Sequence, residues 1–265
     1  MDGKHHFWRI PKILLRTIRI IMNWFSKFKK KELEPIDFSV LKTDMHSHLI
    51  PGIDDGAQTI DESLELISAL QDLGFSKLIT TPHTMSDFYK NTPEIINLGK
   101  KKVQQKLQEL NNDILLESAS EYYVDFEFQN EIGENKFLVF GAKYILIEFP
   151  FMEAPKNIDD IIFQLQLQGY NVVLAHPERY LYYTLKDYKK LTDKGVLLQL
   201  NLLSIIGYYS PEVKKQAQKL IEENLVSFVG TDCHNMSQAE LLKKCFTNSF
   251  WHQLLKSEKL LNSTL

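Results

Sequence analysis

The pattern of apolar and polar positions after about residue 40 predicts strands and helices that alternate along the chain. Short apolar runs, which we expect to form strands, occur at 41–45, 76–81, 114–120, 144–149, 170–176, 196–201 and 225–232. Apolar runs of this length, bounded by polar segments, are typical of strands that are buried on both faces. The pattern therefore favours a parallel α/β arrangement.

The segments between these runs carry the signals of helices. Thr59 and Glu62 have the spacing of a capping box, which predicts a helix that begins there. Further helices are expected over 93–111 and 157–169, and Ser210-Pro211 predicts the start of another. About seven strands would alternate with these helices, which predicts a parallel α/β barrel. In such barrels the active-site residues follow the C-terminal ends of the strands.

Composition and charge limit the class of protein. The chain has 265 residues, of which 44% are hydrophobic and 25% charged, and its net charge is −3. These values are those of a globular protein, and the near-neutral balance gives no support to a nucleic-acid-binding function. Two cysteines, Cys233 and Cys245, do not make a disulfide framework and suit a reducing compartment. We therefore expect a cytoplasmic protein.

The N-terminal segment differs from the rest and divides the chain into an extension, 1–38, and a folded domain, 39–265. Residues 7–31 mix Arg and Lys with Trp, Phe, Ile and Leu, without the apolar run of about 18 residues that a membrane span needs. No secretory signal is evident either. Three interpretations stay open: a basic amphipathic helix on an anionic membrane face, a poorly ordered tail, or a natural start at Met22.

Side chains of the metal-ligating types follow one predicted strand after another. The stretch TDMHSHLIPGIDDGAQT (43–59) contains two histidines and two aspartates, and further His, Glu and Asp residues occur at 83, 121, 148, 176, 232 and 234. A single histidine at a strand end is more often a satisfied polar group than a ligand. Many such residues brought to one barrel rim must be paired or bound to metal, so the series predicts a metal site.

The donor types indicate the class of metal centre. The set contains imidazoles and carboxylates, needs no thiolate, and has too many carboxylates for a structural zinc site. Imidazole with carboxylate suits Mn, Fe or Zn in a multinuclear hydrolytic centre. Such centres use a bridging hydroxide as nucleophile against a phosphoryl group or a carbonyl.

Seven motifs in order carry a resemblance to a known superfamily: TDMHSH, GIDDG, TTPH, SASEYY, LIEFP, AHPERY and GTDCHN. They resemble the PHP (polymerase and histidinol phosphatase) superfamily and, within it, the manganese-dependent tyrosine-protein phosphatases of bacterial capsule and exopolysaccharide clusters. The resemblance runs from about residue 42 to 235. It implies a distorted (β/α)7, TIM-like barrel that holds up to three divalent metals, with Mn2+ expected and Fe, Zn, Co or Mg as alternatives.

The resemblance also implies a role for each motif residue. One metal would be held by His46, His48, Glu121 and Asp232; Glu121 would bridge to a second, completed by Glu148 and His176; and a third would take Asp55, His83 and His234. Asp54 and Asp44 are expected to lie behind the ligands.

Residues outside the ligand set are assigned to the substrate. Arg179 matches the phosphate-binding arginine of the family, and either His234 or Asp55 could assist as an acid. Tyr180, with Tyr182 and Tyr183, is expected either at a substrate-binding rim or in ordinary helix packing. Arginines that the family often carries after the TTPH and D-x-H-N motifs are replaced here by the residues TMSDF and MSQAE.

The implied function is hydrolysis of phosphotyrosine, with the tail of a bacterial tyrosine kinase of capsule or exopolysaccharide synthesis as substrate. The basic N-terminal segment fits peripheral contact with the inner face of the membrane, and a homo-oligomer is compatible with the sequence. Two alternatives stay open: a phosphatase of histidinol phosphate or a sugar phosphate, and a non-catalytic metal-binding module. A cysteine-based phosphatase is disfavoured, because the positions six residues after Cys233 and Cys245 are Ala239 and Trp251 rather than arginine.

Overall fold

The computed structural model describes residues 33–134 and 137–265. The chain divides into two units, Met1–Glu34 and Pro35–Leu265, and the following account concerns the second. The interpretations of residues 7–31 and of Met22 lie outside the described residues, and the boundary between 38 and 39 stays a prediction. Among the helices of the described ranges, none has the length and hydropathy that a membrane crossing requires.

Parallel strands form the centre of the described chain. Their bounds are β1 (Thr43–Asp44), β2 (Lys77–Thr80), β3 (His83–Thr84), β4 (Leu115–Ser118), β5 (Glu121–Tyr123), β6 (Tyr144–Glu148), β7 (Asn171–Ala175), β8 (Leu197–Asn201) and β9 (Val226–Gly230). One sheet has the order β1-β2-β4 and the other the order β3-β5-β6-β7-β8-β9. β2 and β3 are interrupted only at 81–82, and β4 and β5 only at 119–120, so these nine described strands follow seven paths.

The first and last of these paths are joined to each other. Ser47 and Cys233 form a parallel bridge, the Asp232 amide donates to the His46 carbonyl (2.8 Å), and the His48 amide donates to the Cys233 carbonyl (3.0 Å). Nearer the N-terminal ends of the strands, the buried side chain of Asn262 bonds to the backbones of Thr43 and Val229 instead. The parallel α/β architecture that the sequence predicts is confirmed.

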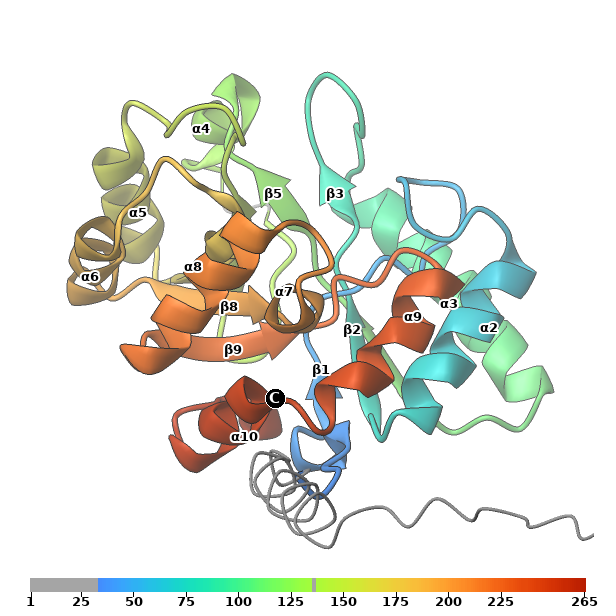
Figure 1. The fold of residues 1–265 in the computed structure, drawn as a ribbon. Coiled ribbons are helices and arrows are strands. Elements are labelled where there is room, and N and C mark those ends of the chain that lie inside the picture. Colours follow the sequence, from blue (N-terminus) through green and yellow to red (C-terminus); the bar gives the residue numbers. More distant parts are fainter. Residues whose placement is uncertain (1–32, 135–136) are drawn as a thin grey trace, which may run out of the picture. The chain divides into compact units, whose positions relative to one another are not determined.

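Helices cover the outer face of the strands. They are α2 (Ile60–Asp72), α3 (Pro93–Glu109), α4 (Phe126–Glu131), α5 (Ile158–Leu167), α6 (Leu185–Asp193), α7 (Leu202–Ile206), α8 (Pro211–Glu222), α9 (Met236–Leu242) and α10 (Ser249–Lys256), with short 3-10 helices at Phe38–Val40, Pro177–Arg179, Lys243–Cys245 and Asn262–Thr264. α2, α3 and α9 lie on one side of the strands, and α5, α6 and α8 on the other (Figure 1).

The predicted helix starts are confirmed by their capping bonds. The Thr59 side chain accepts from the Glu62 amide at the start of α2, and Ser210 accepts from the Val213 amide at the start of α8, with Pro211 in the first turn. These bonds satisfy amides that the helix itself leaves without acceptors. The short helices α4, α7 and α9 were not expected, because each has too few residues to show a period.

Two apolar layers follow from the alternation of side chains along the strands. The smaller cluster lies on the interior side of the strands and takes its buried residues from the strands and from positions beside them: Met45, Ile79, Ala119, Phe140, Leu146, Val173, Ala175 and Phe228. The larger cluster lies between the strands and the helices. The first strand is shorter than the expected 41–45, because Lys42 has a left-handed backbone (φ 63°) that forms a turn before Thr43.

Candidate active site

The C-terminal ends of the strands bring the predicted ligands together. His46 and His48 follow β1, His83 begins β3 and Glu121 begins β5, and Glu148 ends β6; His176 follows β7, and Asp232 and His234 follow β9. Asp55 reaches the same place from the loop between β1 and α2. Most of these side chains are buried, whereas Asp55 is exposed.

The first group consists of His46, His48, Glu121 and Asp232, all fully or almost fully buried. Nε2 of His46 lies 3.3 Å from Glu121 Oε2, 3.3 Å from Asp232 Oδ1 and 3.3 Å from Nε2 of His48. Nε2 of His48 lies 3.6 Å from the same glutamate oxygen and 3.3 Å from the same aspartate oxygen. Donors that surround one ion at about 2.1 Å lie about 3.0–3.4 Å from each other, so the spacing fits a shared cation.

The second group lies beside the first and shares Glu121. His83 Nδ1 is 3.0 Å from Glu121 Oε2 and 3.5 Å from Glu148 Oε2. His176 Nε2 is 2.9 Å from Glu121 Oε1 and 3.5 Å from Glu148 Oε1. Glu121 and Glu148 therefore lie close to both His83 and His176, whereas the resemblance assigns only His176 to this metal.

The third group is the most accessible. Nε2 of His83 and Nε2 of His234 both lie 3.5 Å from Asp55 Oδ1, and His48 completes the group. The rings of His48 and His234 are stacked with 3.9 Å between their centroids. The residues that the resemblance assigns to a third metal are thus neighbours in space.

Buried atoms without hydrogen bonds test whether these residues fit a metal. Glu121 Oε2 and His83 Nδ1 are buried and face each other at 3.0 Å, but they do not have hydrogen-bond geometry. Glu121 Oε2 also faces the imidazole nitrogens of His46 and His48. A buried carboxylate oxygen without a donor is costly, and several lone pairs directed at one point suit a cation. The residues present therefore fit divalent metal ions.

The charges of the cluster also favour a bound cation. Burial opposes the charge of His46, but Glu121 and Asp232 raise its pKa to about 9. Burial likewise opposes the charge of His83, and Glu121 and Glu148 raise its pKa to about 10. Burial and the neighbouring Glu121 raise the pKa of Glu148 to about 8. Carboxylates that favour positive charge so strongly would also favour a divalent cation at this position.

Hydrogen bonds behind the ligands set the direction of their rings. Nδ1 of His48 lies 2.7 Å from Asp54 Oδ2, and Nδ1 of His46 lies 2.8 Å from Gln199 Oε1, which leaves Nε2 of both rings for a metal. Gln199 Nε2 donates to Asn201 Oδ1 (2.9 Å), and Asn201 Nδ2 donates to Asp232 Oδ2 (2.6 Å). A chain of two amides thus connects two members of the first group.

Gln199 and Asn201 were not predicted from the sequence. Their only signal is the run LLQLN of β8, in which polar residues alternate with leucines near the end of an otherwise apolar strand. Both are fully buried, so polar side chains at these positions need partners. Asp44, which was expected behind the ligands, accepts from the amide and hydroxyl of Thr231 and from the amide of His46 (3.4 Å), so it bonds to the backbone of one ligand and holds β1 against the end of β9.

Two glycines let the backbone approach the ligands closely, and two of the ligands have a left-handed backbone. A Cβ atom on Gly56 would lie 2.3 Å from the carbonyl oxygen of His48, and one on Gly230 would lie 2.7 Å from the Cβ of His46. His176 (φ 32°) and Asp232 (φ 49°) adopt left-handed conformations that are unfavourable for residues with a Cβ. Such strain is retained where the surrounding structure requires a side chain to point in one direction.

A cleft of about 440 Å³ opens onto these groups, and Arg179 lies in its wall. The Arg179 guanidinium lies over the rings of Phe151 (4.4 Å to the centroid) and Tyr209 (4.8 Å), and Nη1 donates to Asp232 Oδ2 (3.4 Å). Tyr89 and Tyr123 are further aromatic residues of the same cleft. His234 and Asp55, the two candidate acids, also line it.

The structure corrects the expected position of Tyr180. Its ring is fully buried, and its hydroxyl oxygen accepts from the Phe149 amide (3.0 Å), so it packs in the core instead of contacting a substrate. Tyr182 and Tyr183 pack partly buried against the same core. The aromatic wall of the cleft is supplied by Tyr89, Tyr123, Phe151 and Tyr209, which the sequence analysis did not select.

Comparisons with known proteins give matches over most of the chain. The family model of capsular polysaccharide synthesis proteins CpsB/CapC matches residues 42–250. Tyrosine-protein phosphatase YwqE of Bacillus subtilis is 29% identical over 236 residues, which cover 82% of this chain and 90% of the relative. CapC of Staphylococcus aureus is 31% identical over 77% of this chain and 82% of its own length.

A solved structure with the same fold is also similar in sequence. It comes from crystal structures of YwqE from Bacillus subtilis and CpsB from Streptococcus pneumoniae, described as metal-dependent tyrosine phosphatases. The superposition has a TM-score of 0.70 with 30% identity, and it covers 83% of this chain and 94% of the other.

Proposed function

The chain belongs to the capsular polysaccharide synthesis family CpsB/CapC, and from this premise we propose that it is a metal-dependent protein-tyrosine phosphatase. The observation that carries the proposal is the cleft, which combines the imidazole–carboxylate groups with Arg179 and a wall of aromatic side chains. The phosphate of a phosphotyrosine would lie beside the imidazole–carboxylate groups, and its phenyl ring would lie beside the aromatic wall.

The proposed ligands are those of the three groups. One ion would be held by His46, His48, Glu121 and Asp232. A second would be held by Glu121, Glu148 and His176, and a third by Asp55, His83 and His234. His83 is an additional candidate for the second ion, because it lies as close to both glutamates as His176 does. When bound, divalent ions supply a nucleophile from water at neutral pH and neutralise phosphoryl charge.

The chain's own residues then orient the substrate. The planar guanidinium of Arg179 can donate to two phosphoryl oxygens at once, and its two flanking rings restrict it to one plane. The leaving phenol has a pKa of about 10, so it needs less help from an acid than an alkoxide would. His234 and Asp55 remain the two candidates for that help.

We further propose Mn2+ as the ion and the phosphotyrosine tail of a bacterial tyrosine kinase as the substrate. The imidazole–carboxylate set suits Mn2+, and it also accommodates Fe, Zn or Co, with Mg as a weaker candidate. Action at the inner face of the membrane would follow from the basic segment 7–31, which lies outside the described residues. Unchanged membrane partitioning after deletion of residues 1–35 would remove that part of the proposal.

The test is a metal-reconstituted assay. The full chain is stripped with a chelator, and each divalent ion is then restored in turn. Rates are measured on a phosphotyrosyl peptide, a phosphoseryl peptide and histidinol phosphate. We expect chelation to abolish activity, Mn2+ to restore it, and the phosphotyrosyl peptide to be the best substrate. Arg179→Ala should raise KM by a larger factor than the factor by which it lowers the metal content.

Three results would argue against the proposal. Full activity in the stripped protein would contradict metal dependence. A clear preference for histidinol phosphate would indicate the small-molecule alternative. Bound metal without hydrolysis of any phosphoester would indicate a non-catalytic metal-binding module.

A further inference from the structure

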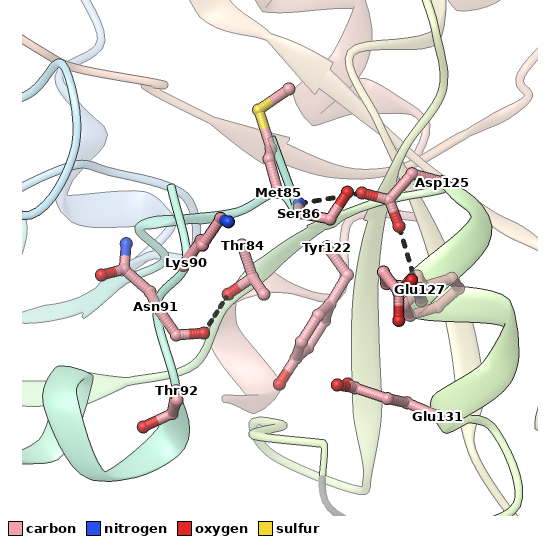
Figure 2. A pocket seen from close by; sticks show the side chains of 11 residues that line it. Thr84, Met85, Ser86, Lys90, Asn91, Thr92, Tyr122, Asp125, Glu127 and Glu131 are labelled. Atoms are coloured by element: carbon pink, nitrogen blue, oxygen red, sulfur yellow. Dashed lines mark hydrogen bonds between the residues drawn. The ribbon is translucent and has the colours of Figure 1, made fainter. Parts of the chain in front are cut away.

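A second cavity of about 310 Å³ adjoins the catalytic cleft. It lies between the loop that follows β3 and the helix α4, and Figure 2 shows side chains from both segments facing it. Met85 lines both this cavity and the cleft, so the two spaces adjoin at this residue. The catalytic groups do not use the second cavity.

The same two strands build the cleft and the cavity. His83 pairs with Glu121 and Thr84 pairs with Tyr122 in the register of β3 and β5. Because side chains alternate along a strand, His83 and Glu121 join the proposed metal groups, while Thr84 and Tyr122 line the cavity. A polypeptide whose phosphotyrosine enters the cleft and whose flanking residues leave it on the Met85 side would pass the mouth of the cavity.

The floor of the cavity is apolar. Tyr122 and Phe128 are almost fully buried, and their rings lie 5.6 Å apart. The hydroxyl of Tyr122 accepts from the Leu138 amide (2.6 Å), which keeps its ring in place. This floor suits the hydrocarbon part of a side chain.

The α4 wall is negatively charged. Glu127 and Glu131 are four residues apart on α4, a spacing that brings their carboxylates to one face of the helix, where they repel each other. Among the described residues, no hydrogen bond or ion pair involves either carboxylate, and both residues are exposed. Asp125 differs, because its two oxygens already accept from the Ser86 and Phe128 amides (2.9 Å each).

We propose that this cavity is a subsite for an arginine or lysine side chain of the phosphotyrosyl polypeptide, close in sequence to the phosphotyrosine. The inference rests on the proposed function and names a preference within it. The stem of the side chain would cover the apolar floor while its charge meets Glu127 and Glu131. Lys90 on the opposite wall restricts the cation to the α4 side of the cavity (Figure 2).

The position of this residue follows from extended-chain geometry. In an extended peptide, side chains two residues apart point the same way and lie about 7 Å from each other. A cation two positions from the phosphotyrosine is therefore expected to reach the cavity over Met85 while the phosphate reaches the cleft.

The test is a peptide scan with the metal-reconstituted full chain. Phosphotyrosyl peptides carry Arg, Gln or Glu at one position from three residues before to three residues after the phosphotyrosine. We expect kcat/KM to be about fivefold higher for Arg than for Glu at a position two residues away, as exposed charge pairs allow. The preference should shrink as salt is added.

Variants of the α4 glutamates test whether the preference for Arg over Glu in the peptide arises from this cavity. The pair Glu127→Gln with Glu131→Gln should remove it, and the pair Glu127→Lys with Glu131→Lys should reverse it. Glu212→Gln, on the exposed start of α8, is the matched control and should keep it. Rates on p-nitrophenyl phosphate, which has no flanking residues, normalise each variant for the amount of intact catalytic site.

The outcomes separate this inference from the proposed function. Equal rates for Arg, Gln and Glu at every scanned position, or a preference that persists in both double variants, overturn the subsite and leave the phosphatase standing. Hydrolysis of p-nitrophenyl phosphate without hydrolysis of any phosphotyrosyl peptide overturns both.

Discussion

At the scale of single residues, the orientation of the proposed ligands depends on neighbours that bind no metal. Gln199 is the clearest case, because its amide oxygen lies 2.8 Å from His46 Nδ1 and its amide nitrogen donates to Asn201. An imidazole whose outer nitrogen donates a hydrogen bond has its inner nitrogen free and fixed for a metal.

Replacement of Gln199 should therefore weaken metal binding without removing a ligand. Gln199→Leu keeps a similar volume but accepts no hydrogen bond, so we expect Mn2+ affinity to fall about 10- to 100-fold. Activity measured against buffered free Mn2+ gives the affinity. The exposed Gln253→Leu is the matched control. An unchanged Mn2+ midpoint in Gln199→Leu would show that the amide does not orient His46.

A second prediction at this scale concerns the two rings around Arg179. Phe151→Ala removes the ring at 4.4 Å and should cost about 1 kcal/mol of phosphate binding, which is about fivefold in KM. Inhibition by inorganic phosphate should weaken by the same factor, because phosphate has no ring that could contact Phe151 directly. Phe163→Ala, exposed on α5, should change neither value. A loss confined to aromatic substrates would contradict a role through Arg179.

The ligands could be predicted from the sequence, whereas their supports could not. His46, His83 and Glu121 have metal-ligating side chains directly after apolar runs, and the barrel rule brings such positions together. Gln199 has an amide that serves many purposes, so its type carries no such signal. The stacking of Phe151 and Tyr209 on Arg179 joins three segments that lie apart in the sequence, which no local pattern reveals.

At the scale of elements, local signals and distant contacts behave differently. The starts of α2 and α8 were predictable, because Thr59 and Ser210 bond to amides three residues away. The junction of β1 and β9 was not predictable. Part of it rests on Asn262, which bonds to backbone groups 33 and 219 positions away along the chain.

The third prediction follows from that junction. Asn262 is fully buried, donates to the carbonyls of Thr43 (3.1 Å) and Val229 (2.7 Å), and accepts from the Val229 amide (3.0 Å). Asn262→Ala leaves three buried backbone groups without partners and should lower the free energy of unfolding by about 2–4 kcal/mol. Urea denaturation measures the change. Asn130→Ala, exposed on α4, is the control, and a loss below about 1 kcal/mol for Asn262→Ala would refute the role.

At the scale of the whole molecule, the proposed metal groups connect six of the nine described strands. Their members come from the ends of β1, β3, β5, β6, β7 and β9, so one cluster of ions would join segments from residue 46 to residue 234. The same convergence puts Glu121, Asp232 and several imidazoles together in a buried volume, where uncompensated charge is costly. Metal binding should therefore contribute to stability as well as to activity.

The fourth prediction is a loss of thermal stability on chelation. A ligand that binds only the folded state at 100 times its dissociation constant contributes about 2.7 kcal/mol. For a domain of this size each kcal/mol shifts the midpoint by about 2–4 °C, so chelation should lower it by roughly 5–10 °C. Calorimetry before and after chelation, and again after Mn2+ is restored, measures the shift. Glu121→Gln, which alters the carboxylate shared by two groups, should show a much smaller response to Mn2+. The midpoint of thermal unfolding of the unmodified chain could instead stay the same with chelator and with Mn2+. That result would mean that the charge of the buried carboxylates is compensated by protonated histidines alone.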